Sequence, residues 1–172
     1  MKKLSSALTL AALLGTSLAQ AQSTFQAFLS GANEVGPNAS PGTGFGTVIL
    51  SADQTQITVN ESFTGLTAPA TASHIHGPAL PGVNASVLFP FSGVPAATSG
   101  SIPELVFSIT PTQVGYLESG LLYMNVHTAN FPGGEIRGQL VQVPEPSVAA
   151  LLVAGLSGAA VWGLRRRHAP QA

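Results

Sequence analysis

Thr47-Val48-Ile49-Leu50 and Ile57-Thr58-Val59-Asn60 decide the fold class of this chain of 172 residues. Their branched side chains lose χ1 freedom in a helix, so both stretches favour an extended backbone. On either side, short apolar or alternating runs are separated by clusters of Gly, Pro, Asn and Ser, and helical periodicity is almost absent. This pattern is typical of an all-β sandwich or barrel, and we expect one antiparallel domain with Greek-key-like connections.

The positions of the individual strands follow from these runs and breaks. The expected strands cover residues 24–30, 44–51, 56–63, 70–76, 85–89, 104–109, 121–127 and 135–141. Prolines at positions 69, 78, 81, 90, 95 and 103 lack the amide hydrogen that a central strand needs, so they mark loops and sheet edges. The segment from Pro90 to Pro103 is rich in Gly, Ala, Ser and Pro, and we expect an exposed loop there.

One short helix is expected between two of these strands. Thr110 can cap it, Pro111 suits its first turn, and Gly120 can end it. Val114 and Leu117 would then share one face of the helix.

The first 21 residues have the layout of a signal peptide. Lys2 and Lys3 are followed by an apolar segment from Leu4 to Leu18, and Ala19-Gln20-Ala21 supplies the small residues of a cleavage site. We therefore expect export and exclude residues 1–21 from the fold.

The last part of the chain, residues 144–172, has the layout of a second targeting signal. Val143-Pro144-Glu145-Pro146 precedes an apolar run at 148–164, and Arg165-Arg166-Arg167 follows that run. As a transmembrane helix, 17 apolar residues reach about 25 Å, near the lower limit for crossing a hydrocarbon core. The three arginines would hold that end in the cytoplasm.

A Pro-Glu-Pro triplet, one short hydrophobic helix and a terminal basic cluster together resemble the PEP-CTERM sorting signal of bacteria that make extracellular polysaccharide. The resemblance implies recognition by an exosortase and processing near the triplet. It also implies an exported protein that is anchored in the inner membrane through its C-terminal helix and then placed at the cell surface or in the extracellular matrix.

Charge and cysteine content exclude several classes of partner and site. The remaining domain, residues 22–143, contains Arg137 as its single basic residue apart from histidine. It contains six acids, which are Glu34, Asp53, Glu61, Glu104, Glu118 and Glu135. Nucleic acids and anionic membrane surfaces need a basic face, so we expect neither as a partner. The chain has no cysteine, which excludes disulfides, thiolate metal sites and cysteine nucleophiles.

Three histidines are the candidate metal ligands. In Ser73-His74-Ile75-His76-Gly77-Pro78 the two imidazoles leave the same face of an extended strand, because side chains at i and i+2 do so. If the strand that carries His127 lies beside this one, three imidazoles converge, which suits copper or zinc. Glu135 would be a fourth ligand or an outer partner of an imidazole. The alternative is structural: each histidine donates to a backbone carbonyl and anchors a loop.

The segment that follows His127 has a second interpretation of its own. Pro132-Gly133-Gly134 permits a tight turn, which would bring Glu135 near His127 across a hairpin. Glu135 and Arg137 share a face of the next strand. We favour a structural ion pair, or a carboxylate bonded to turn amides, over a binding role for these two residues.

We expect no catalytic residues and no enzyme activity. The chain has no Gly-x-Ser-x-Gly elbow, and its one aspartate, Asp53, is far from the histidines in sequence. Nothing in the sequence places two glutamates together for glycoside cleavage, and clustered Asp and Asn for a calcium loop are lacking.

Several motifs resemble the CHRD domain named after chordin. They are Phe28 to Val35, His74 to Ala79, Tyr123 to Thr128 and Phe131 to Leu140, and the similarity covers Thr24 to Val141 in order. The resemblance implies a β-sandwich or barrel. CHRD domains lie in chordin beside modules that bind growth factors, and they occur in many bacterial surface proteins. One departure is Val35-Gly36-Pro37, where the family commonly has paired prolines.

Two hypotheses of function remain. The first is an exported surface or matrix protein with a non-enzymatic structural, adhesive or binding role. Its expected partners are an exosortase-type machinery, extracellular polysaccharide or surface proteins, and the membrane before processing. The alternative is a histidine-based copper or zinc protein for metal storage or redox chemistry. A third interpretation, ligand capture by the segment from Pro90 to Pro103, rests only on the expected exposure of that loop.

Overall fold

The computed structural model describes residues 22–144. The predicted signal peptide, the apolar run at 148–164 and the arginine cluster lie outside the described residues. Within residues 22–144, no helix has the length and apolar character needed to cross a bilayer.

Nine strands, one α-helix and one short 3-10 helix form the described chain. In chain order they are β1 (Ser23–Ser30), η1 (Gly31–Asn33), β2 (Thr43–Leu50), β3 (Gln56–Thr64), β4 (Ala70–His76), β5 (Val87–Pro90), β6 (Gly100–Ser108), α1 (Pro111–Glu118), β7 (Tyr123–Thr128), β8 (Ile136–Gln139) and β9 (Val141–Gln142).

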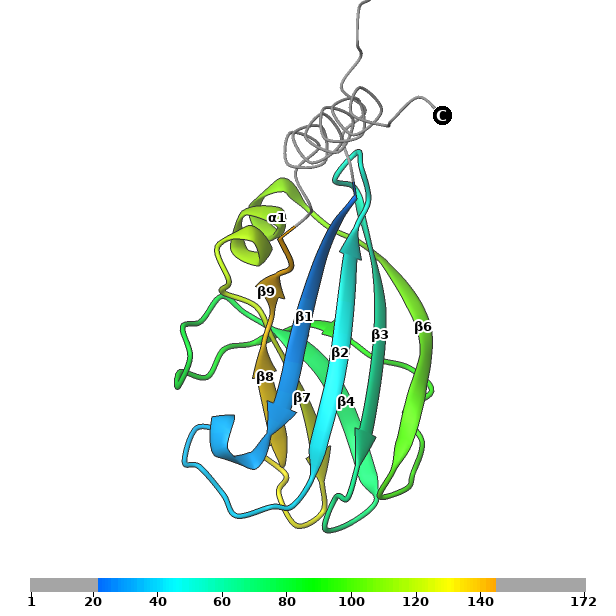
Figure 1. Ribbon diagram of the computed structural model, residues 1–172, viewed down its shortest axis with the longest axis vertical. Coiled ribbons are helices and arrows are strands. Elements are labelled where there is room, and N and C mark those ends of the chain that lie inside the picture. The colour runs from blue at the N-terminus through cyan, green and yellow to red at the C-terminus, as the bar shows by residue number, and fades with distance from the viewer. Residues whose placement is uncertain (1–21, 145–172) are drawn as a thin grey trace, which may run out of the picture.

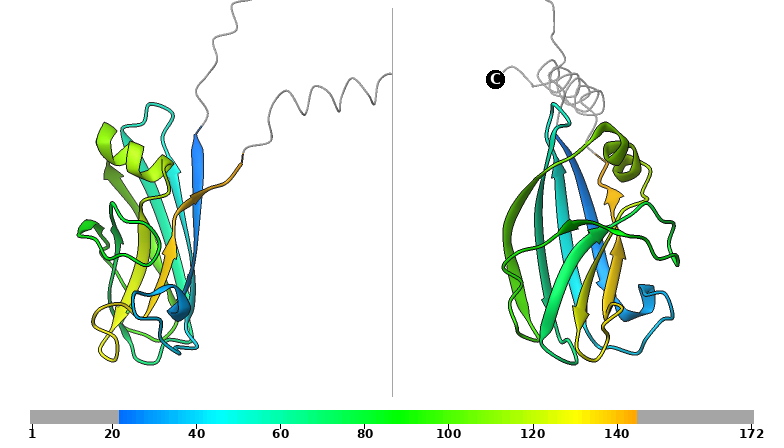
Figure 2. Two further views of the ribbon diagram at one scale, coloured as in Figure 1. Left: turned by 90° about the vertical axis from the view of Figure 1, so that its left-hand side faces the viewer. Right: turned by 180° about the vertical axis from the view of Figure 1, so that it is seen from behind.

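All strand pairs are antiparallel, and they join into one sheet with the order β5-β4-β7-β8-β1-β2-β3-β6, to which β9 adds beside β1. The sheet folds back on itself into a nearly closed barrel. One layer contains β1, β2, β3 and β6, and the layer behind it contains β4, β7 and β8 (Figure 1). Figure 2 shows the two layers edge-on and from behind. The expected all-β antiparallel fold with one short helix is confirmed.

The core lies between the two layers. Alternate side chains of β1, β2 and β3 point inward, as their burial patterns show. They meet Ile75, Met124, Val126 and Ile136 of the other layer, all 0 % exposed. Burying a side chain of this size stabilises the fold by about 1.5–3 kcal/mol relative to leaving it exposed.

One polar contact crosses this core. The Ser73 hydroxyl oxygen lies 2.9 Å and 3.1 Å from the two carboxyl oxygens of Glu61 and 2.9 Å from the Asn125 carbonyl oxygen. Burial raises the pKa of Glu61 to about 8, so its carboxyl is protonated at neutral pH. Because a serine hydroxyl has one hydrogen and a carbonyl can only accept, Ser73 donates to Asn125 while the protonated Glu61 donates to Ser73. This chain joins β3 to β4 and β7 through the core.

The predicted helix is confirmed with its cap. The Thr110 side chain accepts from the Gln113 amide while the Gln113 side chain accepts from the Thr110 amide, which forms a capping box. Val114 and Leu117 are its buried residues. Gly120 follows with a φ of +68°, a conformation that glycine adopts without strain.

The expected loop from Pro90 to Pro103 is only partly correct. β6 begins at Gly100 and pairs with β3 through Gly100 and Phe63, so the last four residues of that segment belong to a strand. The sequence did not predict this part of the strand, because glycine and proline are depleted in strands. β5 and β6 are the two ends of the strand order, so Pro90 and Pro103 do occupy edge strands, as predicted.

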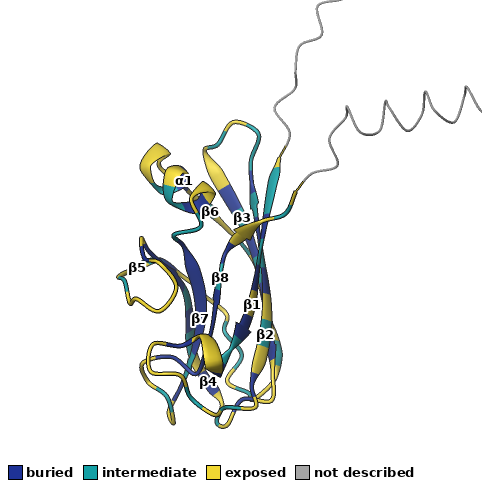
Figure 3. Ribbon diagram, turned by 60° about the vertical axis from the view of Figure 1, so that its left-hand side comes forward, coloured by how far each residue is buried: buried dark blue, intermediate teal, exposed yellow. Residues whose placement is uncertain are grey.

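Burial differs sharply between the two layers. Four consecutive residues of β7, from Tyr123 to Val126, are buried, so both faces of that strand are covered. Along β3, by contrast, buried and accessible residues alternate. Figure 3 shows β7 almost entirely in the colour of buried residues, whereas β2 carries exposed ones. The outer face of β4, β7 and β8 is therefore shielded, and this face carries the three histidines.

Candidate metal centre

The three candidate ligands come from two adjacent strands. His74 and His76 lie on β4, and His127 lies on β7. In the antiparallel ladder His76 is opposite Tyr123, His74 is opposite Asn125, and Ala72 is opposite His127. Directly opposite residues share a face, so all three imidazoles leave the same side of the sheet. The expected pairing of these strands is confirmed.

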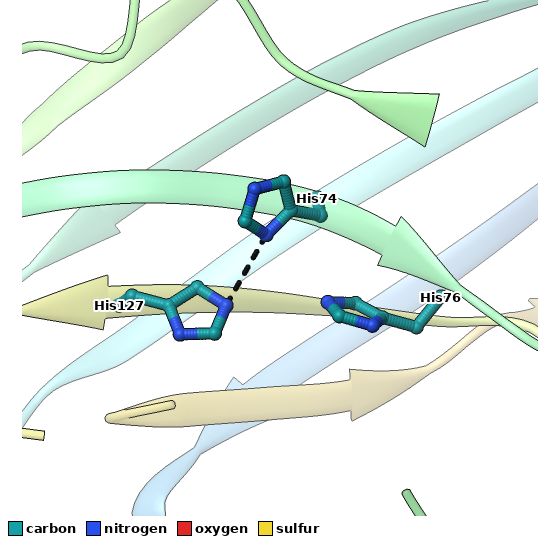
Figure 4. A group of neighbouring side chains, drawn as sticks. All are labelled: His74, His76 and His127. Atoms are coloured by element: carbon teal, nitrogen blue, oxygen red, sulfur yellow. Dashed lines mark hydrogen bonds between the residues drawn. The ribbon is translucent and has the colours of Figure 1, made fainter. Parts of the chain in front are cut away.

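The three side chains converge. One nitrogen from each ring lies within 4.8 Å of the corresponding nitrogens of the other two. His74 Nδ1 and His127 Nε2 are 3.2 Å apart (Figure 4). This is the distance of a hydrogen bond, and it is also close to the roughly 3.3 Å between two nitrogens on one tetrahedral zinc, which His74 Nδ1 could join only after giving up its hydrogen.

Backbone carbonyls set the tautomers of two of the rings. His76 Nδ1 is 2.9 Å from the Ala85 carbonyl, and His127 Nδ1 is 2.9 Å from the Pro132 carbonyl. A carbonyl only accepts, so Nδ1 carries the proton in both neutral rings and each Nε2 keeps its lone pair. The His127 lone pair accepts from His74 Nδ1–H. The His76 Nε2 atom is buried and has no hydrogen-bond partner.

Burial keeps the rings neutral. It lowers the pKa of His74 to about 4, with further lowering from the positive charges that His127 and His76 would carry. Burial also lowers the pKa of His76 and of His127, although the carbonyls of Ala85 and Pro132 partly oppose this. At neutral pH all three imidazoles can therefore offer lone pairs to a cation.

Two of the three rings donate to backbone carbonyls as the structural alternative predicts, and the same arrangement is compatible with a metal ion. Ligating histidines normally fix their orientation by donating the second ring N–H to a carbonyl or carboxylate, as His76 and His127 do. A loop anchor explains these two N–H groups as well, and the Asn125 side chain beside His76 can serve its second nitrogen. Three neutral imidazoles suit copper and zinc, and a three-histidine zinc site keeps one position open.

The hairpin brings Glu135 beside β7, where its amide donates to the Val126 carbonyl at 2.8 Å, but its carboxylate does not join the imidazoles. Its carboxylate accepts from Ser40 Oγ at 2.6 Å, from Thr67 N at 2.7 Å and Thr67 Oγ1 at 3.1 Å, and from Thr128 Oγ1 at 2.6 Å. Burial alone would raise the pKa of Glu135, but these hydrogen bonds outweigh it and hold the pKa below its usual value. The Glu135 carboxylate thus ties two loops to the end of β7, which is close to the structural role favoured from the sequence. It does not belong to the histidine cluster.

Arg137 contributes to the shielded face in a way that the sequence did not reveal. Its guanidinium carbon lies 3.4 Å from the centre of the Tyr123 ring, and that ring stacks on His76 at 4.9 Å with an interplanar angle of 4°. Arg137 also donates to the Val83 carbonyl at 2.8 Å and to Asn84 Oδ1 at 3.3 Å. These bonds hold the loop before β5 over the sheet. The Tyr123 hydroxyl accepts from the Ala85 amide at 3.1 Å, so the same loop also positions the carbonyl that orients His76.

Unpaired polar atoms gather in this layer. Among the described residues, the buried side-chain atoms without a partner are His76 Nε2, Asn125 Oδ1 and Glu34 Oε1. Asn125 lies opposite His74 on one side and Arg137 on the other. Burial raises the pKa of Glu34 to about 7, against the opposing effect of Arg137. The Asn125 side chain lies beside His76, and with its amide oxygen and nitrogen exchanged it would donate to His76 Nε2, so these two atoms do not require a further ligand.

The family comparison covers this whole arrangement. The CHRD domain model matches residues 25–140, a span that contains all three histidines, Glu135 and Arg137. No curated protein and no solved structure matches the chain.

Proposed function

This chain belongs to the CHRD domain family, and we propose that it is a metal-binding member in which His74, His76 and His127 hold one copper or zinc ion. The observation that carries the proposal is the convergence of three imidazoles that burial keeps neutral. The carbonyls of Ala85 and Pro132 support it, because they already hold two rings in the orientation that ligation requires.

Copper is the ion that this donor set should prefer. Divalent affinities at a nitrogen site rise to copper and fall again at zinc, so Cu²⁺ should bind more tightly than Zn²⁺ when both are offered. His74 and His127 are only half-buried, which leaves an approach to the cluster for an ion. We propose a binding role and no catalytic one. Within the described residues, no carboxylate belongs to the cluster to act as a base.

Elemental analysis of protein purified without an affinity tag tests the proposal. After dialysis against copper or zinc and removal of free ion, we expect about one ion per chain, the stoichiometry of a single three-ligand site. The double variant His74→Ala, His76→Ala should retain almost none. His168→Ala is the control, because His168 is the one histidine beyond residues 22–144 and the proposal gives it no ligand role, so loading should not change. Equal and negligible metal in all three proteins would end the proposal.

A second proposal concerns the place where the domain works. We propose that it is exported and displayed at the cell surface or in the extracellular matrix, where an exosortase-type machinery has sorted it. The support is the sequence of both ends, with a basic and apolar start and the Pro144-Glu145-Pro146 triplet before an apolar run and three arginines. Fractionation of cells that express the chain with and without the segment from Val143 onward tests this. Mature protein found wholly in the cytoplasm would contradict it.

A further inference from the structure

The outer face of β1, β2 and β3 is large, open and uncharged. Alternation along these strands turns every second side chain outward. The outward residues are Thr24, Gln26, Phe28 and Ser30 of β1, Thr43, Phe45, Thr47 and Ile49 of β2, and Gln56, Thr58, Asn60, Ser62 and Thr64 of β3. None of them carries a charge, although the domain is acidic. Glu61 points into the core, and the exposed Glu104 lies on β6 three residues after Ser101 and outside the hollow described below.

Two phenylalanines stand out on this face. Phe28 is 71 % exposed and Phe45 is 37 % exposed, and their ring centres are 5.1 Å apart with an angle of 51° between the planes. They are cross-strand partners, so both rings project from neighbouring positions of β1 and β2. Exposed aromatic pairs of this kind contribute little to a core, which makes a binding role the more economical explanation.

The aromatic pair continues into a row of hydroxyl groups. Phe45 is opposite Ser62 on β3, and Ser62 is opposite Ser101 on β6. Four strands at a spacing of about 4.8 Å make this row about 14 Å long. A hollow of about 590 Å³ lies along it, lined by Phe28, Phe45, Ser62 and Ser101 together with Thr43 and Phe63. That volume lies in the range of about 300–1,000 Å³ that is usual for ligand sites.

The chemistry of this row indicates its ligand. The face of an aromatic ring is negative and attracts the weakly positive C–H groups of a sugar ring, while serine and threonine hydroxyls both donate and accept to sugar hydroxyls. An uncharged row offers nothing to an anionic or a cationic polymer. We propose that this face binds a neutral polysaccharide chain that lies across the strands from Phe28 to Ser101.

Other occupants fit the face less well. A lipid surface is anchored by lysine and arginine around the apolar residues, and this face has none. A second copy of the chain would need an interface core that is mostly apolar, but most outward residues here carry hydroxyl or amide groups. The site is on the opposite layer from the histidine cluster, so the two proposals stand or fall separately.

Affinity gel electrophoresis of the full chain in mild detergent tests the proposal. The gels contain hydroxyethylcellulose, dextran or galactomannan as neutral polymers, or alginate as an anionic one. We expect at least one neutral polymer to slow the protein and alginate to leave its migration unchanged. The double variant Phe28→Ser, Phe45→Ser should weaken the binding at least tenfold, and so should Ser62→Glu, which places a charge in the middle of the row.

Val106→Ser on β6 is the matched control, because it removes an exposed apolar side chain outside the hollow. It should bind as the parent protein does, and so should His74→Ala, His76→Ala. The proposal is overturned if migration is unchanged in all three neutral gels, or if alginate alone slows the protein. It is also overturned if the Phe28→Ser, Phe45→Ser variant and Ser62→Glu both bind as the parent protein does. Self-association would replace the proposal if the parent protein sediments as a dimer and binds no polysaccharide, while the Phe28→Ser, Phe45→Ser variant sediments as a monomer.

Discussion

The outer faces of the two layers of this small barrel differ in how far their polar side chains are buried. On the layer of β4, β7 and β8 the outer face carries histidines, an arginine and a tyrosine; His76, Tyr123 and Arg137 are buried there, and His74 and His127 are partly exposed. On the layer of β1, β2 and β3 the outer face carries hydroxyls, amides and two phenylalanines, and it is open. A large pKa shift requires burial of the titrating group away from water. Hydroxyl groups and aromatic rings that bind a neutral ligand must instead be open to that ligand. The difference teaches that a single sheet can support both conditions when loops cover only one of its layers.

The largest expected loss of stability comes from a substitution in the layer of β4, β7 and β8. Arg137→Ala removes the cation from the Tyr123 ring and leaves the Val83 carbonyl and Asn84 without their donor. We expect a loss of about 3 kcal/mol in the free energy of unfolding, measured by urea denaturation. Arg137→Lys keeps the charge but loses the planar fork, so its loss should be intermediate. A loss below about 1 kcal/mol for Arg137→Ala would show that the loop before β5 is held by other contacts.

Raising the pH should weaken the contact between Glu61 and Ser73 that joins the two layers. The pKa of Glu61 is about 8 in the folded protein, raised by burial from 4.5. Its contribution is therefore complete below pH 4.5, and it is lost as the pH rises through 8. We expect the free energy of unfolding, relative to Glu61→Gln, to fall from pH 5 to pH 8 and to level off above pH 8.

Urea denaturation of both proteins across this pH range provides the measurement. Glu34, whose pKa is also raised, and the histidines are present in both proteins, so their contributions cancel in the difference. A difference that does not change with pH would mean that Glu61 is ionised inside the core.

Tyr123→Phe sharpens the comparison within the shielded layer. It keeps the ring between Arg137 and His76 but removes the oxygen that accepts from the Ala85 amide. The cost should be about 1 kcal/mol, the usual value for one buried hydrogen bond. Hydrogen exchange at the Ala85 amide should become faster while exchange along β3 does not change. Equal exchange at Ala85 in both proteins would contradict the assigned bond.

The smallest effect is expected on the open layer. Phe28→Ser changes a side chain that is 71 % exposed, so the free energy of unfolding should shift by about 0.5 kcal/mol or less. The same change should nevertheless weaken polysaccharide binding. A loss of stability as large as that of Arg137→Ala would show that side chains on the two outer faces contribute equally to stability.

Much of this architecture could be predicted from local pattern. The branched stretches in β2 and β3, the capped helix and the shared face of His74 and His76 all depend on spacing along the chain. The position of His127 beside them needed only the pairing of two strands.

Other features depend on contacts between distant segments. Glu135 binds Ser40 and Thr67, which are 95 and 68 residues away and lie in loops without a sequence signature. The stack of Arg137, Tyr123 and His76 requires the register of three strands at once. Glu61 was assigned to no role because a lone acid in an alternating strand does not show which residue it meets across the core.

On the proposal that His74, His76 and His127 bind an ion, the hydrogen between His74 Nδ1 and His127 Nε2 would affect how fast that ion enters. While this hydrogen sits between the two nitrogens, neither can coordinate, and His74 must first release it or carry it on its other nitrogen. Capture then consists of a rearrangement inside the protein followed by a collision with the ion. At high ion concentration the observed rate of loading should level off at the speed of that rearrangement, and in more acidic solution it should be slower.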